Sequence, residues 1–265
     1  MSGARRRLDA ELVRRKLARS RTHAHDLITA GHVEVAGFTA TKPATQVESG
    51  VSIRVNDSAE EWASRGAHKL LGALDAFDVP VTGRRVLDAG ASTGGFTDVC
   101  LRRGAREVVA VDVGYGQLAW RLQSDPRVTV MDRTNIRYLE LDEPCDMMVG
   151  DLSFISLKLV LDPILAALTP DADLLPMVKP QFEVGKDRLG HGGVVRSPQL
   201  REEVTSDFIL FAQTRGVGCK GVVASPLPGP SGNVEYFVWL RRGASPMSES
   251  AVTAAVHRAV EEGPQ

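Results

Sequence analysis

Aromatic residues and cysteines are scarce in this chain of 265 residues. Trp, Tyr and Phe together make up 5% of the sequence, and Phe38 is the only aromatic residue before Trp62. We therefore do not expect base stacking on aromatic side chains in the N-terminal part. The three cysteines, Cys100, Cys145 and Cys219, lie far apart, lack CxxC spacing and cannot all pair. This usage predicts reduced, structural thiols rather than a disulfide framework.

Long apolar runs are also missing. No stretch approaches the roughly 18 apolar residues that a membrane-spanning helix needs. The N-terminal residues MSGARRRLDAELVRRKLARSR are basic, but the apolar core of a signal peptide does not follow them. We therefore expect a mature cytoplasmic protein. The six histidines show no pattern of metal ligands, so no metal site is expected.

Charge is distributed unevenly, although the whole chain carries a net charge of only −1. Residues 1–57 hold 10 Lys and Arg against 6 Asp and Glu, and residues 58–265 hold 22 against 27. Such a basic cluster repels itself, and binding to a polyanion relieves that repulsion. Each cation alone fits a solvated helix face, but the cluster favours RNA, contacted through phosphates and shape. The candidate RNA-binding residues are Arg5, Arg6, Arg7, Arg14, Arg15, Lys16, Arg19, Arg21 and Lys42.

The first 57 residues show the pattern of a small α+β domain. LDAELVRRKL and RTHAHDLITA have helical spacing, whereas HVEVAG and the end of KPATQVESGVSIRV are typical of strands. The polar segment NDSAEEW follows. We therefore predict an RNA-binding domain over residues 1–57, a linker over 58–64 and a larger domain over 65–265.

Strand and helix patterns alternate through the larger domain. Apolar segments such as RRVLDAG, EVVAVDV and ADLLPMVKP are separated by helical segments of crossover length. This alternation predicts an α/β fold with a doubly wound, mostly parallel, Rossmann-like sheet. Pro163 should kink or split the helix predicted over SLKLVLDPILAALT.

The glycine-rich stretch DAGASTGG follows the first predicted strand, where such sheets bind ligands. Ser92 occupies the middle glycine position of a dinucleotide fingerprint, and Asp88 would repel a diphosphate. A carboxylate suits the amine of S-adenosylmethionine better. Asp112 lies 22 residues after Gly90, where a carboxylate can bind ribose hydroxyls. The pattern predicts a class I methyltransferase whose cofactor residues are Asp88, Gly90, Ser92, Gly94, Gly95, Phe96, Asp112, Asp132 and Asp151. In this set Asp132 ends the third strand and is expected to meet the adenine amine.

The methyl acceptor is indicated by two lysines and two acids. Asp151 and Lys179 end the fourth and fifth predicted strands, Glu235 begins the last, and Lys69 precedes the first. The sequence DLSF replaces the motif typical of amine methylation, and Cys145 is badly placed for attack on a pyrimidine. A sugar hydroxyl needs a base, and burial beside a second lysine favours a neutral lysine. Against this, Lys179 could simply snorkel at a strand end and Lys69 could face solvent on a helix.

These four residues match the Lys-Asp-Lys-Glu tetrad of FtsJ-like ribose 2′-O-methyltransferases. The chain also resembles the TlyA family of rRNA cytidine-2′-O-methyltransferases, also described as haemolysins, over nearly its full length. The most specific stretches are SRGAHKL, DAGASTGGFT, VKPQFEVGK and ASPLPGPSGNVEYF. The resemblance implies a ribosomal-protein-type RNA-binding domain, Lys179 as the base with Lys69, Asp151 and Glu235 in support, and ribosomal RNA within assembled subunits as the substrate. The longer basic N-terminus resembles members that modify both 16S and 23S rRNA.

Some expectations remain open at this point. The family linker resembles Arg-x-Trp-Val, whereas this chain has EEWA, so Glu60 replaces the basic residue. A non-catalytic ribosome assembly factor is one alternative, and a membrane-acting haemolysin with a basic amphipathic helix over Arg5–Arg21 is another. We expect a monomer without stable membrane association. The segment EVGKDRLGHGGVVRSP, Glu183–Pro198, is predicted to be either a loop that orders with substrate or an exposed connection.

Overall fold

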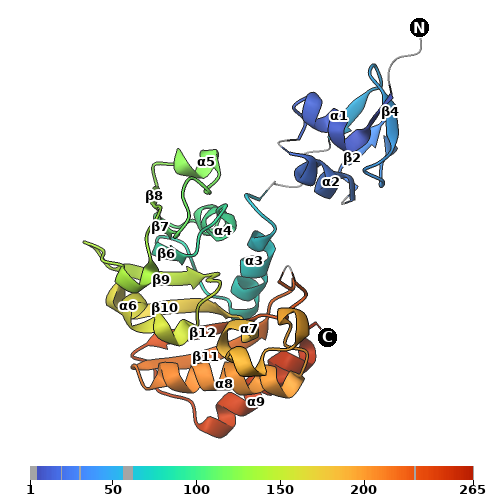
Figure 1. Cartoon of the computed structure of the whole chain (residues 1–265). Coiled ribbons are helices and arrows are strands. Elements are labelled where there is room, and N and C mark those ends of the chain that lie inside the picture. Colours follow the sequence, from blue (N-terminus) through green and yellow to red (C-terminus); the bar gives the residue numbers. More distant parts are fainter. Residues whose placement is uncertain (1–4, 19, 30, 56–61, 230, 265) are drawn as a thin grey trace. The chain divides into compact units, whose positions relative to one another are not determined.

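The chain divides into an N-terminal unit, Met1–Glu61, and a C-terminal unit, Trp62–Gln265 (Figure 1). The computed structural model describes residues 5–18, 20–29, 31–55, 62–229 and 231–264. Each unit has its own buried hydrophobic cluster. The predicted linker spans the division, and its residues 58–61, Glu60 among them, lie outside the described residues.

The N-terminal unit is the predicted small α+β domain. Its elements are β1 (Arg5–Arg7), α1 (Leu8–Arg14), α2 (Arg21–Thr29), β2 (Val33–Val35), β3 (Phe38–Thr39), β4 (Gln46–Glu48) and β5 (Ile53–Val55). Strands β3, β2 and β5 form an antiparallel sheet, and β1 pairs with β4. Leu8, Leu12 and Ile28 are fully buried between the helices and strands.

The basic helix over Arg5–Arg21 that the haemolysin alternative invoked is wrong. Arg5–Arg7 is a strand, and the following helix ends at Arg14. Three consecutive arginines carry no alternating pattern, so only the pairing with β4 reveals the strand. The apolar side of α1, with Leu8 and Leu12, faces the core of the unit.

The C-terminal unit is built on a seven-stranded sheet. Its strands are β6 (Arg85–Ala89), β7 (Glu107–Val111), β8 (Val128–Met131), β9 (Cys145–Gly150), β10 (Leu168–Val178), β11 (Val217–Ala224) and β12 (Tyr236–Arg242). The spatial order is β11-β12-β10-β9-β6-β7-β8, and β12 alone runs opposite to the other six strands. This order confirms the doubly wound, mostly parallel sheet predicted from the sequence.

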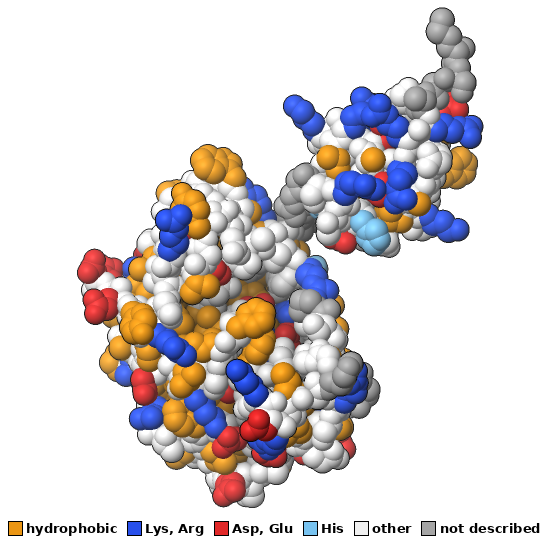
Figure 2. Space-filling model, viewed as in Figure 1, with side chains coloured by type: hydrophobic (Ala, Val, Ile, Leu, Met, Phe, Trp, Pro, Cys, Tyr) orange, Lys and Arg blue, Asp and Glu red, His pale blue; other side chains and the backbone are white. Residues whose placement is uncertain are grey.

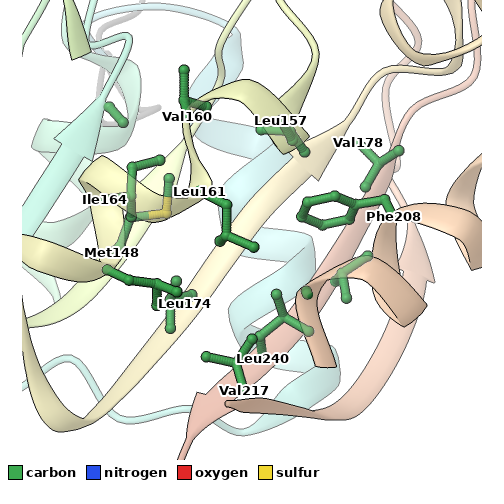
Figure 3. Close-up of a cluster of buried hydrophobic side chains, with 14 of the residues drawn as sticks. Met148, Leu157, Val160, Leu161, Ile164, Leu174, Val178, Phe208, Val217 and Leu240 are labelled. Carbon is green, nitrogen blue, oxygen red and sulfur yellow. The ribbon is translucent and has the colours of Figure 1, made fainter. Parts of the chain in front are cut away.

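Helices cover both faces of the sheet (Figure 1). They are α3 (Gly66–Phe77), α4 (Gly95–Arg102), α5 (Trp120–Gln123), α6 (Leu161–Ala166), α7 (Pro180–Glu183), α8 (Pro198–Gln213) and α9 (Glu249–Glu262). Successive strand residues point to opposite faces. Val86 therefore joins the cluster under α3 and α4, whereas Leu87 joins the one under α6, α8 and α9. Figure 3 shows part of this second cluster, with Phe208 of α8 beside Val178.

Of two helix predictions, the split near Pro163 is confirmed and the helix over GQLAWRL is too long. The segment around Pro163 is split into a 3₁₀ turn, Leu157–Leu159, and α6, which agrees with the expected effect of proline. The helix predicted over GQLAWRL is only α5, one turn long. Among the described residues, no helix is both long and apolar enough to span a membrane.

The direction of β12 determines where the candidate site forms. The carboxyl ends of the parallel strands β7, β9 and β10 lie at one end of the sheet, and antiparallel β12 begins at that same end. Asp112, Asp151 and Lys179 directly follow their strands, and Glu235 directly precedes β12. The fold thus brings residues that are distant in the sequence to the carboxyl ends of the parallel strands, where ligand sites of such sheets typically lie.

Candidate active site

Two lysine–carboxylate pairs, both with buried lysines, lie at these strand ends. Lys69 Nζ on α3 is 2.5 Å from Glu235 Oε2, and both side chains are buried. Lys179 Nζ is 2.5 Å from Asp151 Oδ1 and donates a hydrogen bond of 2.7 Å to Ser153 Oγ. The structure therefore brings all four residues of the predicted tetrad to one site. Ser153 was missed, although it lies within the DLSF stretch that follows β9.

Burial of these charged groups requires close partners, because an isolated charge is costly to remove from water. Lys69 is 5% exposed and Lys179 is 7% exposed, so neither faces solvent as the simpler alternatives would have it. Gly229 leaves room for the acid of the first pair. A Cβ atom at Gly229 would lie 2.7 Å from Glu235 Oε1.

The glycine-rich turn between β6 and α4 supplies close backbone approach. Gly90 and Gly94 have φ of +86° and +95°, conformations that glycine adopts easily. A Cβ atom at Gly90 would lie 3.0 Å from the carbonyl oxygen of Asp151. A Cβ atom at Gly95 would collide with Ser64 and lie 3.0 Å from the Ala67 nitrogen. The turn is therefore pressed between β9 and the start of α3.

Two adjoining cavities open on this turn. The loop cavity, about 240 Å³, contacts Lys69, Gly90, Gly95, Phe96 and Lys179. The strand-end cavity, about 410 Å³, contacts Asp112 and runs along the ends of β7 and β9. Both are also lined by Gly90, Ser92, Asp151 and Ser153. Together the two adjoining cavities form a groove along the strand ends, lined by polar side chains, by glycines and by apolar side chains such as Ile136 and Leu152.

The acids after β7 and β8 hold neighbouring backbone. Asp112 accepts hydrogen bonds from the Ser92 nitrogen at 2.9 Å and the Gly114 nitrogen at 2.7 Å, and it lines the strand-end cavity. Asp132 accepts from the Gly116 nitrogen at 2.7 Å. The residues lining the strand-end cavity beyond β8 are instead Thr134 to Arg137. Asp132 thus supports a loop beside the groove.

Asp88 lies elsewhere than expected. It is the penultimate residue of β6, fully buried, and its carboxyl accepts a hydrogen bond of 2.6 Å from Thr97 Oγ1. It does not line the loop cavity or the strand-end cavity. The pKa of Asp88 is raised to about 7, mainly by burial and also by the nearby Asp151 and Asp112 carboxylates, although the hydrogen bonds from Thr97 oppose the shift. The side chain supports the glycine turn from beneath.

A larger cavity of about 800 Å³ adjoins the loop cavity and shares Ser153 and Lys179 with it. Phe154, 91% exposed, and Phe182 line it with ring centroids 5.1 Å apart. Phe154 has φ of +63°, an uncommon conformation for a residue with a side chain. Arg137 and Lys186 add positive charge, and Glu235 also contributes to the wall. Figure 2 shows the C-terminal unit hollowed on this face, with hydrophobic and basic side chains around the hollow.

The predicted RNA-binding arginines of the N-terminal unit are partly engaged by two buried acids. Asp9 binds Arg7 and Arg21, and Glu11 binds Arg14 and Arg15. These guanidinium groups hold the pKa of both acids at about 2, below the ordinary value. Arg15 also donates to the carbonyl oxygens of Val51 and Ser49, so it is largely structural.

The remaining predicted cations of the unit differ in their surroundings. Arg5 is 3.5 Å from Glu48. Arg6, Lys16 and Lys42 are exposed and form no ion pair within the described part of the chain. Arg19 lies outside the described residues.

The described residues include no group of three His, Cys, Asp or Glu side chains suited to a metal ion.

The start of the C-terminal unit contacts the glycine turn. The Arg102 guanidinium lies 4.3 Å from the centre of the Trp62 ring, and the Ala63 nitrogen donates to Asp98 Oδ2 at 2.9 Å. Asp98 also binds Arg102 and Arg121. Ser64 and Arg65 then line the loop cavity. The end of the predicted linker is therefore part of the wall beside the glycine turn.

Comparison with known proteins gives consistent matches for both units. Residues 62–242 match the FtsJ-like methyltransferase family, and residues 6–53 match the S4 domain. The chain is 57% identical to the 16S/23S rRNA (cytidine-2′-O)-methyltransferase TlyA of Mycobacterium tuberculosis, over 98% of this chain and 99% of that protein. It is 33% identical to the 23S rRNA (cytidine-2′-O)-methyltransferase TlyA of Campylobacter jejuni, over 68% and 71% of the two chains.

A solved structure is similar over the same length. A Streptococcus thermophilus protein that carries a hemolysin name superposes with a TM-score of 0.74 and 34% identity. The match covers 97% of this chain and 96% of that one.

Proposed function

The chain belongs to the TlyA family of FtsJ-like methyltransferases, and we propose that it transfers a methyl group from S-adenosylmethionine to the 2′-hydroxyl of cytidine in ribosomal RNA. The observation that carries this proposal is the position of Lys179. Its side chain lies on the wall shared by the loop cavity and the large cavity. A base at this boundary faces the methyl donor on one side and the acceptor on the other.

The groove formed by the loop cavity and the strand-end cavity suits S-adenosylmethionine. When bound, this molecule supplies an electrophilic methyl group on a sulfonium. Gly90, Ser92, Gly95, Phe96, Asp112 and Asp151 line the groove and would hold it. Asp88, Gly94 and Asp132 would contribute without contacting the ligand, because they hold the turns that form the groove. The close approach of Gly90 to Asp151 fits a ligand that lies across both elements.

Lys179 is the proposed general base. A neutral Nζ would accept the proton of the 2′-hydroxyl as the oxygen bonds to the methyl carbon and the carbon–sulfur bond breaks, with the sulfur leaving as a neutral thioether. General-base catalysis of this kind contributes about 10²–10⁴-fold. Asp151 and Ser153 orient Nζ, because both contact it directly. The Lys69–Glu235 pair borders the same space and would orient the ribose.

RNA recognition would involve both units. The large cavity offers aromatic and cationic side chains that suit a nucleotide, namely Phe154, Phe182, Arg137 and Lys186. In the N-terminal unit, the S4 match and the exposed Arg6, Lys16 and Lys42 support contact with RNA phosphates. We expect 16S and 23S rRNA within ribosomal subunits to be the substrates, since the Mycobacterium relative is named for both. Such subunits are found in the cytoplasm.

Methylation of purified ribosomal subunits tests the proposal. Lys179→Ala should reduce methyl transfer by about 100-fold or more while S-adenosylmethionine binding, measured by calorimetry, persists. Lys158→Ala is a matched control, because Lys158 is a lysine of the same unit whose side chain contacts Asp207 and the Phe211 ring and lines none of the three cavities. It should retain activity.

The product and its location decide the chemistry. Mass spectrometry of the rRNA should place the methyl group on a cytidine ribose, and comparison of the two subunits shows which are modified. A methyl group on the base would contradict the acceptor. Full activity of Lys179→Ala would contradict the role of that lysine.

A further inference from the structure

The segment Glu183–Pro198, here called the glycine arm, forms one wall of the large cavity. Gly185, Lys186, Leu189, Gly192 and Gly193 line the cavity directly. Gly185, Gly192 and Gly193 have φ of +78°, +74° and +74°, so the backbone turns sharply at positions where a residue with a side chain would be strained. The arm has no strand or α-helix of its own between α7 and α8. Its position therefore depends on contacts with the rest of the unit.

The arm is anchored by a side chain at each end, the half-buried Glu183 and the buried Asn233. At its start, the Glu183 carboxylate accepts hydrogen bonds from Ser156 Oγ at 2.5 Å and from the Leu157 nitrogen at 2.7 Å. Near its end, Asn233 Oδ1 accepts from the Val195 nitrogen at 2.9 Å, and Asn233 Nδ2 donates to the Gly193 carbonyl at 2.9 Å.

The second anchor is deeply buried. Asn233 is 3% exposed and Val195 is 5% exposed. If the arm moved away, the amide and the two backbone groups would lose partners in a place where water reaches them poorly. The Asn233 side-chain amide therefore holds the backbone of the glycine arm through both its donor and its acceptor atom.

Asn233 also belongs to the turn that holds Glu235. The Asn233 carbonyl accepts from the Gly229 nitrogen at 2.9 Å, and the Glu235 carbonyl accepts from the Ser225 nitrogen at 2.8 Å. Residues two positions apart in extended chain point to the same side. Both Asn233 and Glu235 line the large cavity. One short turn thus connects the arm to the Lys69–Glu235 pair.

We propose that Asn233 is a positioning residue that fixes the glycine arm as the wall of the acceptor site. The proposal rests on the function proposed for the large cavity. Asn233 binds the arm and not the reacting atoms, so it sets how well the RNA nucleotide is held. Loss of the amide should weaken acceptor binding more than it slows the chemical step.

Asn233→Ala in the full-length protein tests this role. Hydrogen exchange of the arm residues Gly193–Arg196, followed by mass spectrometry, should become faster than in the unmodified protein. The KM for ribosomal subunits should rise by about tenfold, with kcat changed by less than about threefold. Binding of S-adenosylmethionine should be unchanged, because Asn233 does not line the loop cavity or the strand-end cavity.

Two further variants separate anchoring from folding. Asn233→Gln keeps both the donor and the acceptor of the amide on a longer side chain, so it should show intermediate exchange and remain informative if the alanine variant does not fold. Glu203→Gln removes an exposed ion pair of 2.5 Å between α8 and Arg188 of the arm. Exposed pairs contribute little, so exchange and KM should remain unchanged.

Unchanged exchange of the arm in both Asn233 variants would overturn the proposal. Loss of kcat with an unaltered KM, the pattern expected of Lys179→Ala, would also overturn it, because Asn233 would then act in the chemical step. Failure of the unmodified protein to methylate RNA would contradict the proposed function instead. In that case the exchange comparison would still show whether Asn233 anchors the arm.

Discussion

The acid of the first buried pair depends on a residue without a side chain. Gly229 lies against Glu235, and a Cβ atom there would be 2.7 Å from Oε1. Gly229→Ala should therefore displace the carboxylate from Lys69. We expect kcat for methyl transfer to fall by about 10- to 100-fold, because small misplacements of positioning groups have effects of this size. Single-turnover kinetics with saturating S-adenosylmethionine measure it.

Gly50→Ala provides the comparison for this change. A Cβ atom at Gly50 meets nothing within 4 Å, so this substitution should leave the rate unchanged. Equal rates for Gly229→Ala and the unmodified protein would show that Glu235 tolerates displacement, or that its position does not matter.

The buried Asp88 predicts a pH dependence of stability. Its pKa is raised from 3.8 to about 7, so the folded state binds this proton more tightly than the unfolded state. The stabilisation is therefore complete at low pH and is lost as pH rises from about 4 to about 7. Asp88→Asn cannot ionise, yet its amide oxygen can still accept from Thr97. The variant should gain stability relative to the unmodified protein as pH rises through this window.

Chemical denaturation at several pH values between 4 and 8 measures the difference in free energy of unfolding. The difference should change by no more than a few kcal/mol and should level off above pH 7. Parallel stability curves for the two proteins would mean that Asp88 is ionised throughout, or that it titrates as in the unfolded chain.

A site residue could be predicted from the sequence where a local sequence pattern marks its position. Lys179 is followed by proline at the end of an apolar strand, and Lys69 lies in a stretch specific to the family. The burial of Asp88 was not predictable, because its partner Thr97 is nine residues further along and only the fold brings the two together. Ser153 and Asn233 are ordinary polar loop residues in the sequence. Their contacts come from segments far away in the chain.

The glycine turn and the short helix α5 pack against each other. Gly94 has φ of +95°, and a Cβ atom there would collide with the buried Leu122 and lie 2.7 Å from Leu118 Cδ1. Gly94→Ala should therefore shift α5 away from the start of α4. We expect S-adenosylmethionine affinity, measured by calorimetry, to fall by at least about tenfold, since the same turn forms the groove.

Gly116→Ala separates collision from backbone strain. Gly116 also has a positive φ, +63°, but nothing lies within 4 Å of its Cβ position. This variant should lose roughly 1–2 kcal/mol of stability from the left-handed backbone alone. If both variants reduced affinity equally, strain in the loops rather than packing against α5 would be responsible.

Most helices and strands of the C-terminal unit were predictable, because their apolar residues repeat with clear periods. Strand β10 begins earlier than its apolar core, because Leu168 already pairs with Cys145 of β9, before a register shift between Leu168 and Asp173. Strand β1 is made of arginines, and its pairing with β4 is a contact between segments about 40 residues apart. Local pattern carries no information on such pairing.

The charge difference between the two units should be visible in how RNA binding responds to salt. Each phosphate contact that is lost lowers the slope of log K against log salt by about 0.7–0.9. Replacing Arg6, Lys16 and Lys42 together by alanine should therefore reduce the slope by about 2–3 if all three contact phosphates. Filter binding of rRNA fragments at several salt concentrations measures it.

A matched pair of cations on the C-terminal unit serves as the control. Lys220 on β11 and Arg258 on α9 are both exposed and lie outside the three cavities. Their replacement by alanine should leave the slope unchanged. An equal decrease in both sets would indicate that overall charge, rather than a surface of the N-terminal unit, determines RNA affinity.

The place of β12 in the sheet has a consequence for how the molecule is made. Strand β11 is synthesised first, yet among the described strands it pairs only with β12, which lies between it and β10. Until Arg242 has left the ribosome, β11 has no strand partner and β10 keeps an open edge. Asp173 of β10 likewise gains its hydrogen bonds from Trp239 and Arg241 only after those residues have been synthesised. The C-terminal unit therefore completes its sheet, and gains Glu235 in its final position, only when nearly the whole chain has been translated.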